Sequence, residues 1–258
     1  MLTVLTIFLI ALNFSHAYAV LTPSERSRLA SVEKRALTSW VSMTKGSDWP
    51  CSSSQLKDIE KSIEYAKILA NGAMVALDNT GTSSKAYVRW FGKTNTNKAQ
   101  LSTIKTSHFG APNRFLQTPS STVKSYDEGG PNSQRLVYAC PPQDFPLCNG
   151  GVAAAAINSG DQIFKTNILL ACPSFFKKAS NSQMLSNWRK GKYTPSAGMI
   201  LLHETQHLDA IVGKGKRCVD LAYPVDSCEK LADKDKIRNA QNYAFFALDV
   251  TAIPPKRK

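Results

Sequence analysis

The chain has 258 residues, of which 43% are hydrophobic and 20% are charged, and its formal net charge at pH 7 is +13. This length is enough for one sizeable hydrophobic core, and a basic surface attracts polyanions such as acidic cell-wall polymers. The basic residues are scattered, and aromatic residues do not interleave with them as they would in a base-stacking platform. We therefore exclude specific nucleic-acid binding and expect a monomer with at most a weak polyanion or cell-wall association.

The N-terminal segment 1–19 has the pattern of a cleaved secretory signal peptide. It carries no charged residue, contains a long apolar run and ends in the small-x-small sequence Ala17-Tyr18-Ala19. The apolar run is too short to span a bilayer, and no later stretch resembles a membrane span. We therefore expect a secreted, extracellular protein.

The dibasic pair Lys34-Arg35 lies within an amphipathic pattern that predicts a helix over residues 23–44. Pairs of this kind are cut by kexin-like processing proteases, so one interpretation is a short pro-segment over residues 20–35. The other interpretation places the pair on the solvated face of the helix. The remaining residues 36–258 are expected to form the functional domain.

The rest of the chain predicts helices, then a small sheet, then helices again. Apolar residues three or four apart predict a long helix over residues 52–77, and shorter helices are expected over 83–91 and 97–107. Gly, Pro and Asn turns then separate four β-compatible runs, over residues 121–125, 135–139, 152–157 and 163–170. A final helix is expected over 227–248. This order indicates a single α+β domain whose small sheet is mostly antiparallel.

Six cysteines lie downstream of the expected signal peptide, and this even number suggests three disulfide bonds formed in an oxidising compartment. Cys218 and Cys228 are close in the sequence, so we expect them to pair locally. The other four are then assigned as two further pairs, Cys51 with Cys140 and Cys148 with Cys172.

The most informative stretch is His203-Glu204-Thr205-Gln206-His207, because it fits a zinc site and a general base onto one turn of helix. Two histidines four residues apart lie on the same helical face, so both imidazoles can bind one Zn²⁺. Glu204 lies beside them, where it can take a proton from a water held at the open position of the metal. Thr194-Pro195 is expected to start this helix and Gly213 to end it.

A catalytic zinc site takes three protein ligands, so the two histidines need a third partner. Of the two other histidines, His16 belongs to the expected signal peptide. His108 lies far upstream in a polar region, where we expect a surface position. A carboxylate is therefore predicted as the third ligand.

The acidic residues downstream can be ranked by geometry. Asp209 lies about 200° around the helix from His207 and faces away from the metal. Asp220 follows a glycine-containing loop that can fold the chain back toward the site, with Tyr223 close by. We prefer Asp220 as the third ligand, and Glu229 on the following helix is the alternative.

With these residues the chain resembles the aspzincins, the family of zinc metalloproteases that includes fungal deuterolysins and peptidyl-lysine metalloendopeptidases. Their His-Glu-x-x-His helix is followed by Gly-Thr-x-Asp-x-x-Tyr-Gly, and Asp220 and Tyr223 match its Asp-x-x-Tyr. Arg217-Cys218 replaces the Gly-Thr and Pro224 replaces the last Gly, which indicates a divergent fungal-type branch. Three further stretches resemble the family, namely Tyr87-Val-Arg-Trp-Phe-Gly92, Cys172-Pro-Ser-Phe-Phe176 and Asn239-Ala-Gln-Asn-Tyr-Ala-Phe-Phe246.

The resemblance implies a zincin-like fold and a secreted zinc endopeptidase that binds one Zn²⁺ per chain and acts on proteins or peptides. It makes His203, His207 and Asp220 the zinc ligands, Glu204 the general base, and Tyr223 a donor to the oxyanion of the tetrahedral intermediate. The alternative is a non-catalytic secreted protein that binds zinc or interacts with a host on the same scaffold. The intact Glu204 favours the enzyme, since a zinc binder has no use for a base.

Overall fold

The computed structural model describes residues 37, 39–44, 46–161 and 164–255. All of them belong to one unit, residues 35–258. The predicted signal peptide and pro-segment lie outside the described residues, so both remain predictions.

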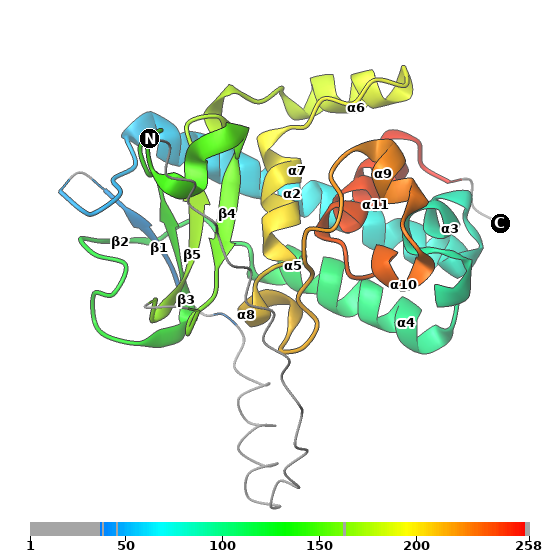
Figure 1. Ribbon diagram of the computed structural model, residues 1–258, viewed down its shortest axis with the longest axis horizontal. Helices are drawn as coiled ribbons and strands as arrows, with labels where there is room; N and C mark the ends of the chain where they lie inside the picture. Colours follow the sequence, from blue (N-terminus) through cyan, green and yellow to red (C-terminus); the bar gives the residue numbers. More distant parts are fainter. Residues whose placement is uncertain (1–36, 38, 45, 162–163, 256–258) are drawn as a thin grey trace, which may run out of the picture. The chain divides into compact units, whose positions relative to one another are not determined.

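A five-stranded sheet has its strands in the order β2-β1-β3-β5-β4 (Figure 1). The strands are β1 (Ser39–Met43), β2 (Ser121–Val123), β3 (Asn132–Ala139), β4 (Ala154–Ile157) and β5 (Thr166–Ala171). Strands β2 to β5 confirm the four β-compatible runs. The α+β class is confirmed as well, because helices precede and follow these four strands along the chain.

The prediction of a mostly antiparallel sheet is wrong. β1 runs parallel to both β2 and β3, β3 runs parallel to β5, and only β4 runs antiparallel to β5. The central strands explain this result because they are buried on both faces. In β3, Leu136 and Tyr138 belong to the main helical core, whereas Val137 and Ala139 belong to a second apolar cluster on the opposite face. Continuous apolar runs of this kind are typical of parallel strands that are covered on both sides.

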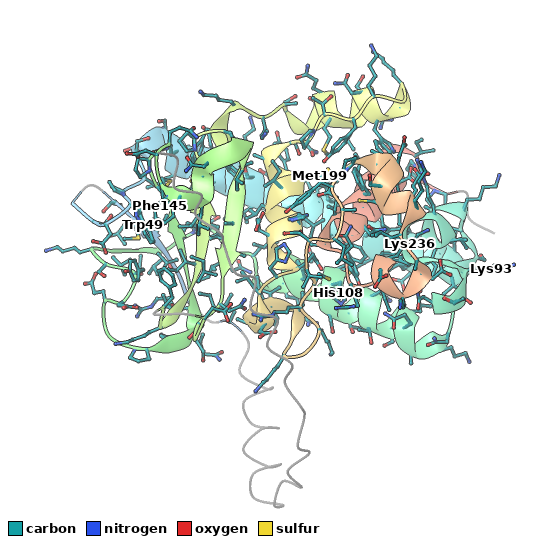
Figure 2. All side chains as sticks on the ribbon, in the orientation of Figure 1. Trp49, Lys93, His108, Phe145, Met199 and Lys236 are labelled. Atoms are coloured by element: carbon teal, nitrogen blue, oxygen red, sulfur yellow. A yellow bond between two sulfur atoms is a disulfide. The ribbon has the colours of Figure 1, made fainter. Side chains whose placement is uncertain are left out.

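Aromatic side chains from loops cover the second cluster. Trp49 stacks on Tyr126 with ring centroids 5.1 Å apart and packs against Phe145 at 5.0 Å. Figure 2 shows Trp49 and Phe145 together beside the strands. Since loops close this face, the long helices pack on the other face, where the candidate site lies.

The predicted helix over residues 23–44 is wrong in its last part, because Ser39–Met43 forms β1. This strand lies between β2 and β3 and pairs with both. Val41 and Met43 are buried in the second cluster. Their partners come from residues about 80 to 100 positions later in the chain, so a local amphipathic pattern could not reveal them. The part of the predicted helix before residue 37 lies outside the described residues.

The helices N-terminal to the sheet region follow the prediction closely. Helix α2 begins with a capping box, in which the Ser52 hydroxyl accepts from the Gln55 N–H and the Gln55 side chain accepts from the Ser52 N–H. The predicted helix over 97–107 is present as α4, which continues into a π-helical turn over Ile104–Gly110. The helices in this part of the chain are α2 (Ser53–Thr80), α3 (Lys85–Phe91), α4 (Lys98–Thr103) and α5 (Ala111–Phe115).

The predicted final helix over 227–248 is broken into separate helices. Asp233 accepts hydrogen bonds from the N–H and the hydroxyl of Thr94, which fixes the chain to a distant loop at the break. The helices after the sheet are α6 (Asn181–Arg189), α7 (Ala197–Thr205), α8 (Asp209–Val212), α9 (Val225–Lys230), α10 (Asp233–Lys236) and α11 (Ala240–Ala252). Among the described residues, no helix is both long enough and apolar enough to cross a bilayer.

Two of the three predicted disulfides are confirmed, Cys51 with Cys140 and Cys148 with Cys172. The predicted pairing of Cys218 with Cys228 is wrong, because both are buried free thiols. The Cys228 thiol donates to the carbonyl of Ala222 at 3.2 Å. Closeness in sequence was therefore a poor guide, since each side chain is held by its own surroundings.

Candidate metal centre

Helix α7 carries the histidine motif and packs against α2, α11 and strand β4 (Figure 1). Its N-cap is Ser196, whose hydroxyl accepts from the Met199 N–H, so the predicted start at Thr194-Pro195 is two residues too early. Gly198 allows the close approach to α2, because a Cβ there would lie 2.5 Å from the Cβ of Tyr65. Ser196 thus fixes the start of α7, and Gly198 lets it pack closely against α2.

The helix ends at Thr205, and His207 already lies in the turn that follows, so the predicted continuation to Gly213 is wrong. Asn158 from the loop after β4 explains the break. Its amide donates to the carbonyl of His207 at 2.9 Å, and its side-chain oxygen accepts from the Asp209 N–H at 2.7 Å. These backbone groups therefore pair with Asn158 and not with a continuing helix.

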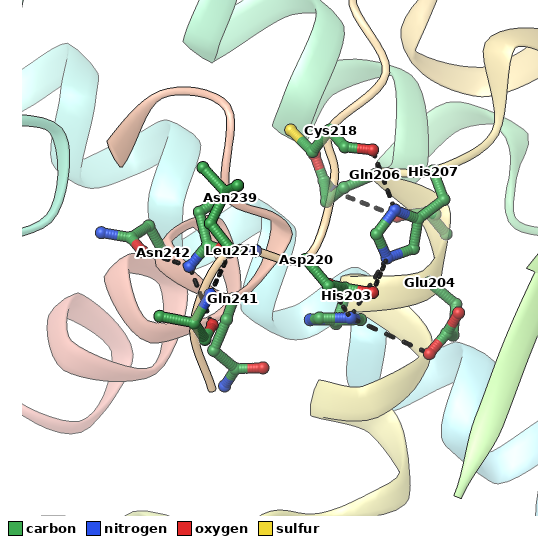
Figure 3. A network of polar contacts seen from close by, with 12 residues as sticks. His203, Glu204, Gln206, His207, Cys218, Asp220, Leu221, Asn239, Gln241 and Asn242 are labelled. Carbon is green, nitrogen blue, oxygen red and sulfur yellow. Dashed lines mark hydrogen bonds and ion pairs between the residues drawn. The ribbon is translucent and has the colours of Figure 1, made fainter. Parts of the chain in front are cut away.

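Three predicted ligand side chains converge on one point (Figure 3). The Nε2 atoms of His203 and His207 are 3.2 Å apart. Oδ1 of Asp220 lies 3.1 Å from His203 Nε2, and Oδ2 lies 3.3 Å from His207 Nε2. The structure therefore brings His203, His207 and Asp220 together, although Asp220 is thirteen residues beyond His207 in the sequence.

This geometry fits a small divalent cation. Zinc binds nitrogen and oxygen ligands at about 2.0–2.2 Å, so neighbouring ligands in a tetrahedral site are about 3.3–3.6 Å apart. The observed separations are close to these values. Among the described residues, this is the only group of three or more His, Cys, Asp or Glu side chains arranged in this way.

The two imidazoles are oriented differently. His207 places Nδ1 3.0 Å from the carbonyl of Cys218, so Nδ1 carries the proton that it donates and Nε2 presents its lone pair to the cluster. His203 stacks against the ring of Tyr223 with centroids 5.8 Å apart, and its buried Nδ1 has no hydrogen-bond partner among the described residues. Backbone contact therefore fixes one ring, and packing fixes the other.

The loop that carries Asp220 is held by Asn239, a residue whose role the sequence analysis missed. The side-chain oxygen of Asn239 accepts from the N–H groups of Leu221 at 2.9 Å and Ala222 at 3.2 Å. Its amide donates to the carbonyl of Ala222 at 3.0 Å. Asn239 begins one of the stretches that resemble the family, and that was the only available signal. Asn239 thus braces this loop, although the predicted Cys218–Cys228 bridge does not form.

The two histidines keep the Asp220 carboxylate ionised. Burial raises the pKa of Asp220, but the contacts with both histidines outweigh this effect and hold the pKa well below its usual range. Burial lowers the pKa of His207, and the Asp220 carboxylate outweighs that effect and raises it to about 8. The carboxylate is therefore ionised at neutral pH, as a metal ligand must be.

Glu204 lies beside this cluster with its side chain almost fully buried. Its carboxylate oxygen is 4.0 Å from His203 Nε2, and the backbone N–H of Ala156 in β4 donates to it. Burial is the largest effect and raises the pKa of Glu204, while the nearby histidines lower it. A buried carboxylate with a raised pKa is a stronger base than an exposed one and is suited to accepting a proton.

Tyr223 covers the outer side of the cluster and is 56% exposed. Burial of its hydroxyl and a hydrogen bond with Asp220 raise the pKa of the phenol above its ordinary value. The hydroxyl therefore stays protonated and can donate a hydrogen bond to a group bound at the site.

The other candidate ligands lie elsewhere. Glu229 pairs with Arg89 and is not part of the cluster. The prediction of a surface position for His108 is wrong, because only 3% of this residue is exposed. Its Nδ1 donates to the Gln206 side-chain oxygen at 2.9 Å, and its ring stacks on Tyr243 with centroids 4.2 Å apart. The unpredicted π-helical turn places the histidine there.

A pocket of about 360 Å³ opens directly beside the cluster. His203, Glu204 and Tyr223 form one wall of it. The remainder comes from the loop before β4 and the start of that strand, from the segment between α6 and α7, from the first turn of α7 and from the start of α11. The arrangement therefore offers a metal-binding cluster, a buried base and a hydrogen-bond donor at the mouth of a cavity that can hold a side chain.

Comparisons with known proteins point to one family. The profile of the aspzincin M35 family, described as lysine-specific metallo-endopeptidase, matches residues 76–248. A neutral protease 2 homologue from Coccidioides posadasii is 29% identical over 121 residues, which are 46% of this chain and 29% of that protein. A neutral protease 2 homologue from Arthroderma gypseum is 27% identical over 197 residues, 76% of this chain and 45% of that protein. The chain thus spans less than half the length of these curated relatives.

Among solved structures, the zinc peptidase from Grifola frondosa is similar to this chain with a TM-score of 0.53 and 18% sequence identity. The match covers 78% of this chain and 98% of that structure. At this identity the similarity establishes a common fold, and the chemistry of the site has to be argued from its own residues.

Proposed function

Because the chain belongs to the aspzincin family of metallo-endopeptidases, we propose that it is a secreted zinc-dependent endopeptidase. The observation that carries the proposal is the convergence of His203, His207 and Asp220 around a common point, with buried Glu204 beside it. Metal ligands alone would suit a binding protein, but a buried carboxylate next to them suits a hydrolase.

His203, His207 and Asp220 would hold one zinc ion per chain. This is a three-ligand set of the kind that leaves a fourth position open for water. When bound, zinc supplies a Lewis acid that polarises a water molecule and the scissile carbonyl. Asp220 also offsets the positive charge of the ion, and the Cys218 carbonyl keeps His207 in the tautomer that can bind it.

Glu204 acts as the general base and then as the general acid. Its carboxylate accepts a proton from the attacking water as the new bond to the carbonyl carbon forms. The same proton then passes to the leaving amine when the peptide bond breaks. Burial supports this role because it raises the pKa of the carboxylate.

Tyr223 donates a hydrogen bond to the carbonyl oxygen as that oxygen gains negative charge. Its protonated phenol and its place on the pocket wall support this role. Removing a donor of this type costs other hydrolases about 10²–10³ in kcat.

The free edge of the sheet supplies a binding site for the substrate backbone. β4 is an edge strand, and it packs against α7 next to the cluster. An extended peptide can add to such an edge through main-chain hydrogen bonds. Endopeptidase activity is consistent with this, since an open edge accommodates chain on both sides of the scissile bond.

Secretion is supported by the two disulfide bonds, which are typical of oxidising compartments. The uncharged segment 1–19 supports the same destination.

The test is to purify the protein, measure its zinc content, and incubate it with a peptide library with and without a chelator. We expect about one zinc per chain and cleavage that the chelator abolishes. Glu204→Gln should retain the zinc and lose about 10²–10⁴-fold in kcat, because an amide keeps the shape of the side chain but cannot accept the proton.

Gln183→Glu on the exposed surface of α6 serves as the control and should cleave like the wild type. Cleavage by Glu204→Gln at the wild-type rate would remove Glu204 from the mechanism. Zinc binding without any chelator-sensitive cleavage would favour a non-catalytic zinc-binding protein instead.

A further inference from the structure

Given the proposed endopeptidase function, the pocket beside the cluster lies where the side chain that adjoins the scissile bond would enter. Met199 and Ile200 lie four residues before His203 and Glu204, and all four line the cavity. Residues four apart share a helical face, so the pocket begins one helical turn from the ligand and the base. A substrate residue whose carbonyl or amide is held at Glu204 therefore directs its side chain into this cavity.

Away from His203, Glu204 and Tyr223, the lining of the pocket is mostly apolar. Met199 is almost fully buried, with 1% of its surface exposed, and forms part of the floor. Ile200, Pro195, Val152 and Ala153 complete the apolar lining. Surfaces of this kind bind apolar side chains because contact with them removes hydrocarbon from water.

Besides His203, Glu204 and Tyr223, two polar side chains line the pocket, and both are uncharged. The Gln241 amide, which is buried, donates to the Tyr193 hydroxyl at 3.1 Å. The Tyr193 ring packs edge-on against Phe245 with centroids 4.9 Å apart, which fixes this pair against the core. Figure 3 shows Gln241 at the start of α11, beside the ligand cluster.

The described residues that line this pocket include only one carboxylate, that of Glu204. The proposed mechanism already uses Glu204 as the base. A lysine or arginine side chain entering the cavity would therefore lose its hydration without gaining an opposite charge, which is costly. The chain as a whole carries a net charge of +13, so its field does not stabilise a further positive charge in the pocket.

We propose that this pocket selects a large uncharged side chain, aromatic or long aliphatic, next to the scissile bond and rejects lysine. The volume of about 360 Å³ suits a large group, because a small side chain would leave much of the apolar wall without contacts. The family is described as lysine-specific, and the neutral lining sets this chain apart from that description.

The first experiment compares peptides that differ only at the residue adjoining the scissile bond, which carries Phe, Leu or Lys. The library maps on which side of the bond that residue lies. We expect kcat/KM for the Phe and Leu peptides to exceed that for the Lys peptide by about 100-fold or more. Equal or faster cleavage of the Lys peptide overturns the proposal, while the proposed endopeptidase function stands.

The second experiment places a carboxylate in the pocket with Gln241→Glu. The ratio of kcat/KM for the Lys peptide to kcat/KM for the Phe peptide should be at least about tenfold higher in this variant than in the wild type. Gln183→Glu adds the same charge on the exposed surface of α6 and should leave the preference unchanged. An unchanged preference in a folded Gln241→Glu protein overturns the proposal.

The third experiment measures binding without turnover, so the specificity is tested apart from catalysis. Calorimetry with the Glu204→Gln protein should give tighter binding of the Phe peptide than of the Lys peptide by about tenfold or more. This preference in binding, together with a wild-type protein that cleaves nothing, supports the pocket assignment and overturns the endopeptidase function. Equal binding of the two peptides counts against the pocket assignment.

Discussion

The candidate metal centre is built from two unlike regions, the end of α7 and the loop that precedes α9. His203 and Glu204 lie on a helix, and their side chains are almost fully buried. Asp220 lies on a chain segment without regular secondary structure, and about a third of its side chain is exposed. The first region is ordered by packing in the core. The second is ordered by hydrogen bonds, from the Asn239 side chain and from the backbone of Val219 to Arg238 and Ala240.

This difference shows how local and non-local order combine in one site. The i, i+4 spacing brings both histidines to one face, and the backbone hydrogen bonds of the helix end keep them there. The loop exposes Val219, Leu221 and Tyr223, and loops of this kind open more readily than core helices. We therefore expect substitutions in the two regions to differ in kind, and four predictions test the contrast.

The largest effect is expected at the helix. Replacing His203 and His207 together with Ala removes two of the three proposed ligands and should abolish zinc binding. The metal content after dialysis against metal-free buffer checks this result, and circular dichroism shows whether the helix remains. Full zinc occupancy in the folded double variant would mean that the metal binds elsewhere.

The next effect compares the two carboxylates. Asp220→Ala should weaken zinc binding by more than about 100-fold, which exceeds the usual cost of losing a supporting group. Glu229→Ala removes only the ion pair with Arg89 on the surface and should leave zinc binding unchanged. Competition with a chelator of known affinity measures both. A larger loss in Glu229→Ala would transfer the ligand role to Glu229.

The third prediction concerns the buried support of α7 and its dependence on pH. Burial and, to a smaller extent, the Lys216 ammonium outweigh the opposite effect of the Gln206 hydrogen bond and lower the pKa of His108 to about 4. Its unfolded value is about 6.5, so the unfolded chain binds more protons between these values. Stability is therefore complete above about pH 6.5 and falls as the pH drops toward 4, by about 3 kcal/mol from this residue.

Urea unfolding at pH 7, 6, 5 and 4 measures that loss. His108→Asn stays neutral and should lose less stability than the wild type over the same range, by up to about 3 kcal/mol. Groups shared by both proteins cancel in this difference. If the unfolding free energies of the two proteins fall by the same amount between pH 7 and pH 4, His108 does not titrate in this way.

The smallest expected effect lies at the support of the loop. Asn239→Ala leaves the backbone N–H groups of Leu221 and Ala222 without their partner, so it should cost about 2 kcal/mol of unfolding free energy. It should also weaken zinc binding by about 10–100-fold, because Asp220 loses its fixed position.

Asn95→Ala is the matched control for that substitution. The Asn95 amide also joins two backbone segments, at Phe91 and Asp233, but these lie away from the cluster. It should lower stability without changing zinc affinity. If the two variants weaken zinc binding equally, Asn239 acts only through global stability, and the contrast between helix and loop is lost.

Local sequence patterns were enough for helix α2 and for half of the site. Ser52 with Gln55 marks the start of α2, and the spacing of His203 and His207 brings their two side chains together. Each of these signals depends on residues within four positions, although Asn158 also fixes the turn that carries His207. Asp220 was the preferred third ligand because a loop can return it to the histidines and because it matches the Asp-x-x-Tyr motif. The structure places the three side chains together.

Only the tertiary structure decided the features that depend on partners distant in the chain. β1 is a strand because β2 and β3 flank it, and α7 stops before His207 because Asn158 binds the backbone there. His108 is buried because the π-helical turn aims it at Gln206. In each case the free energy comes from burial and hydrogen bonds between segments far apart in sequence, and no local pattern records it.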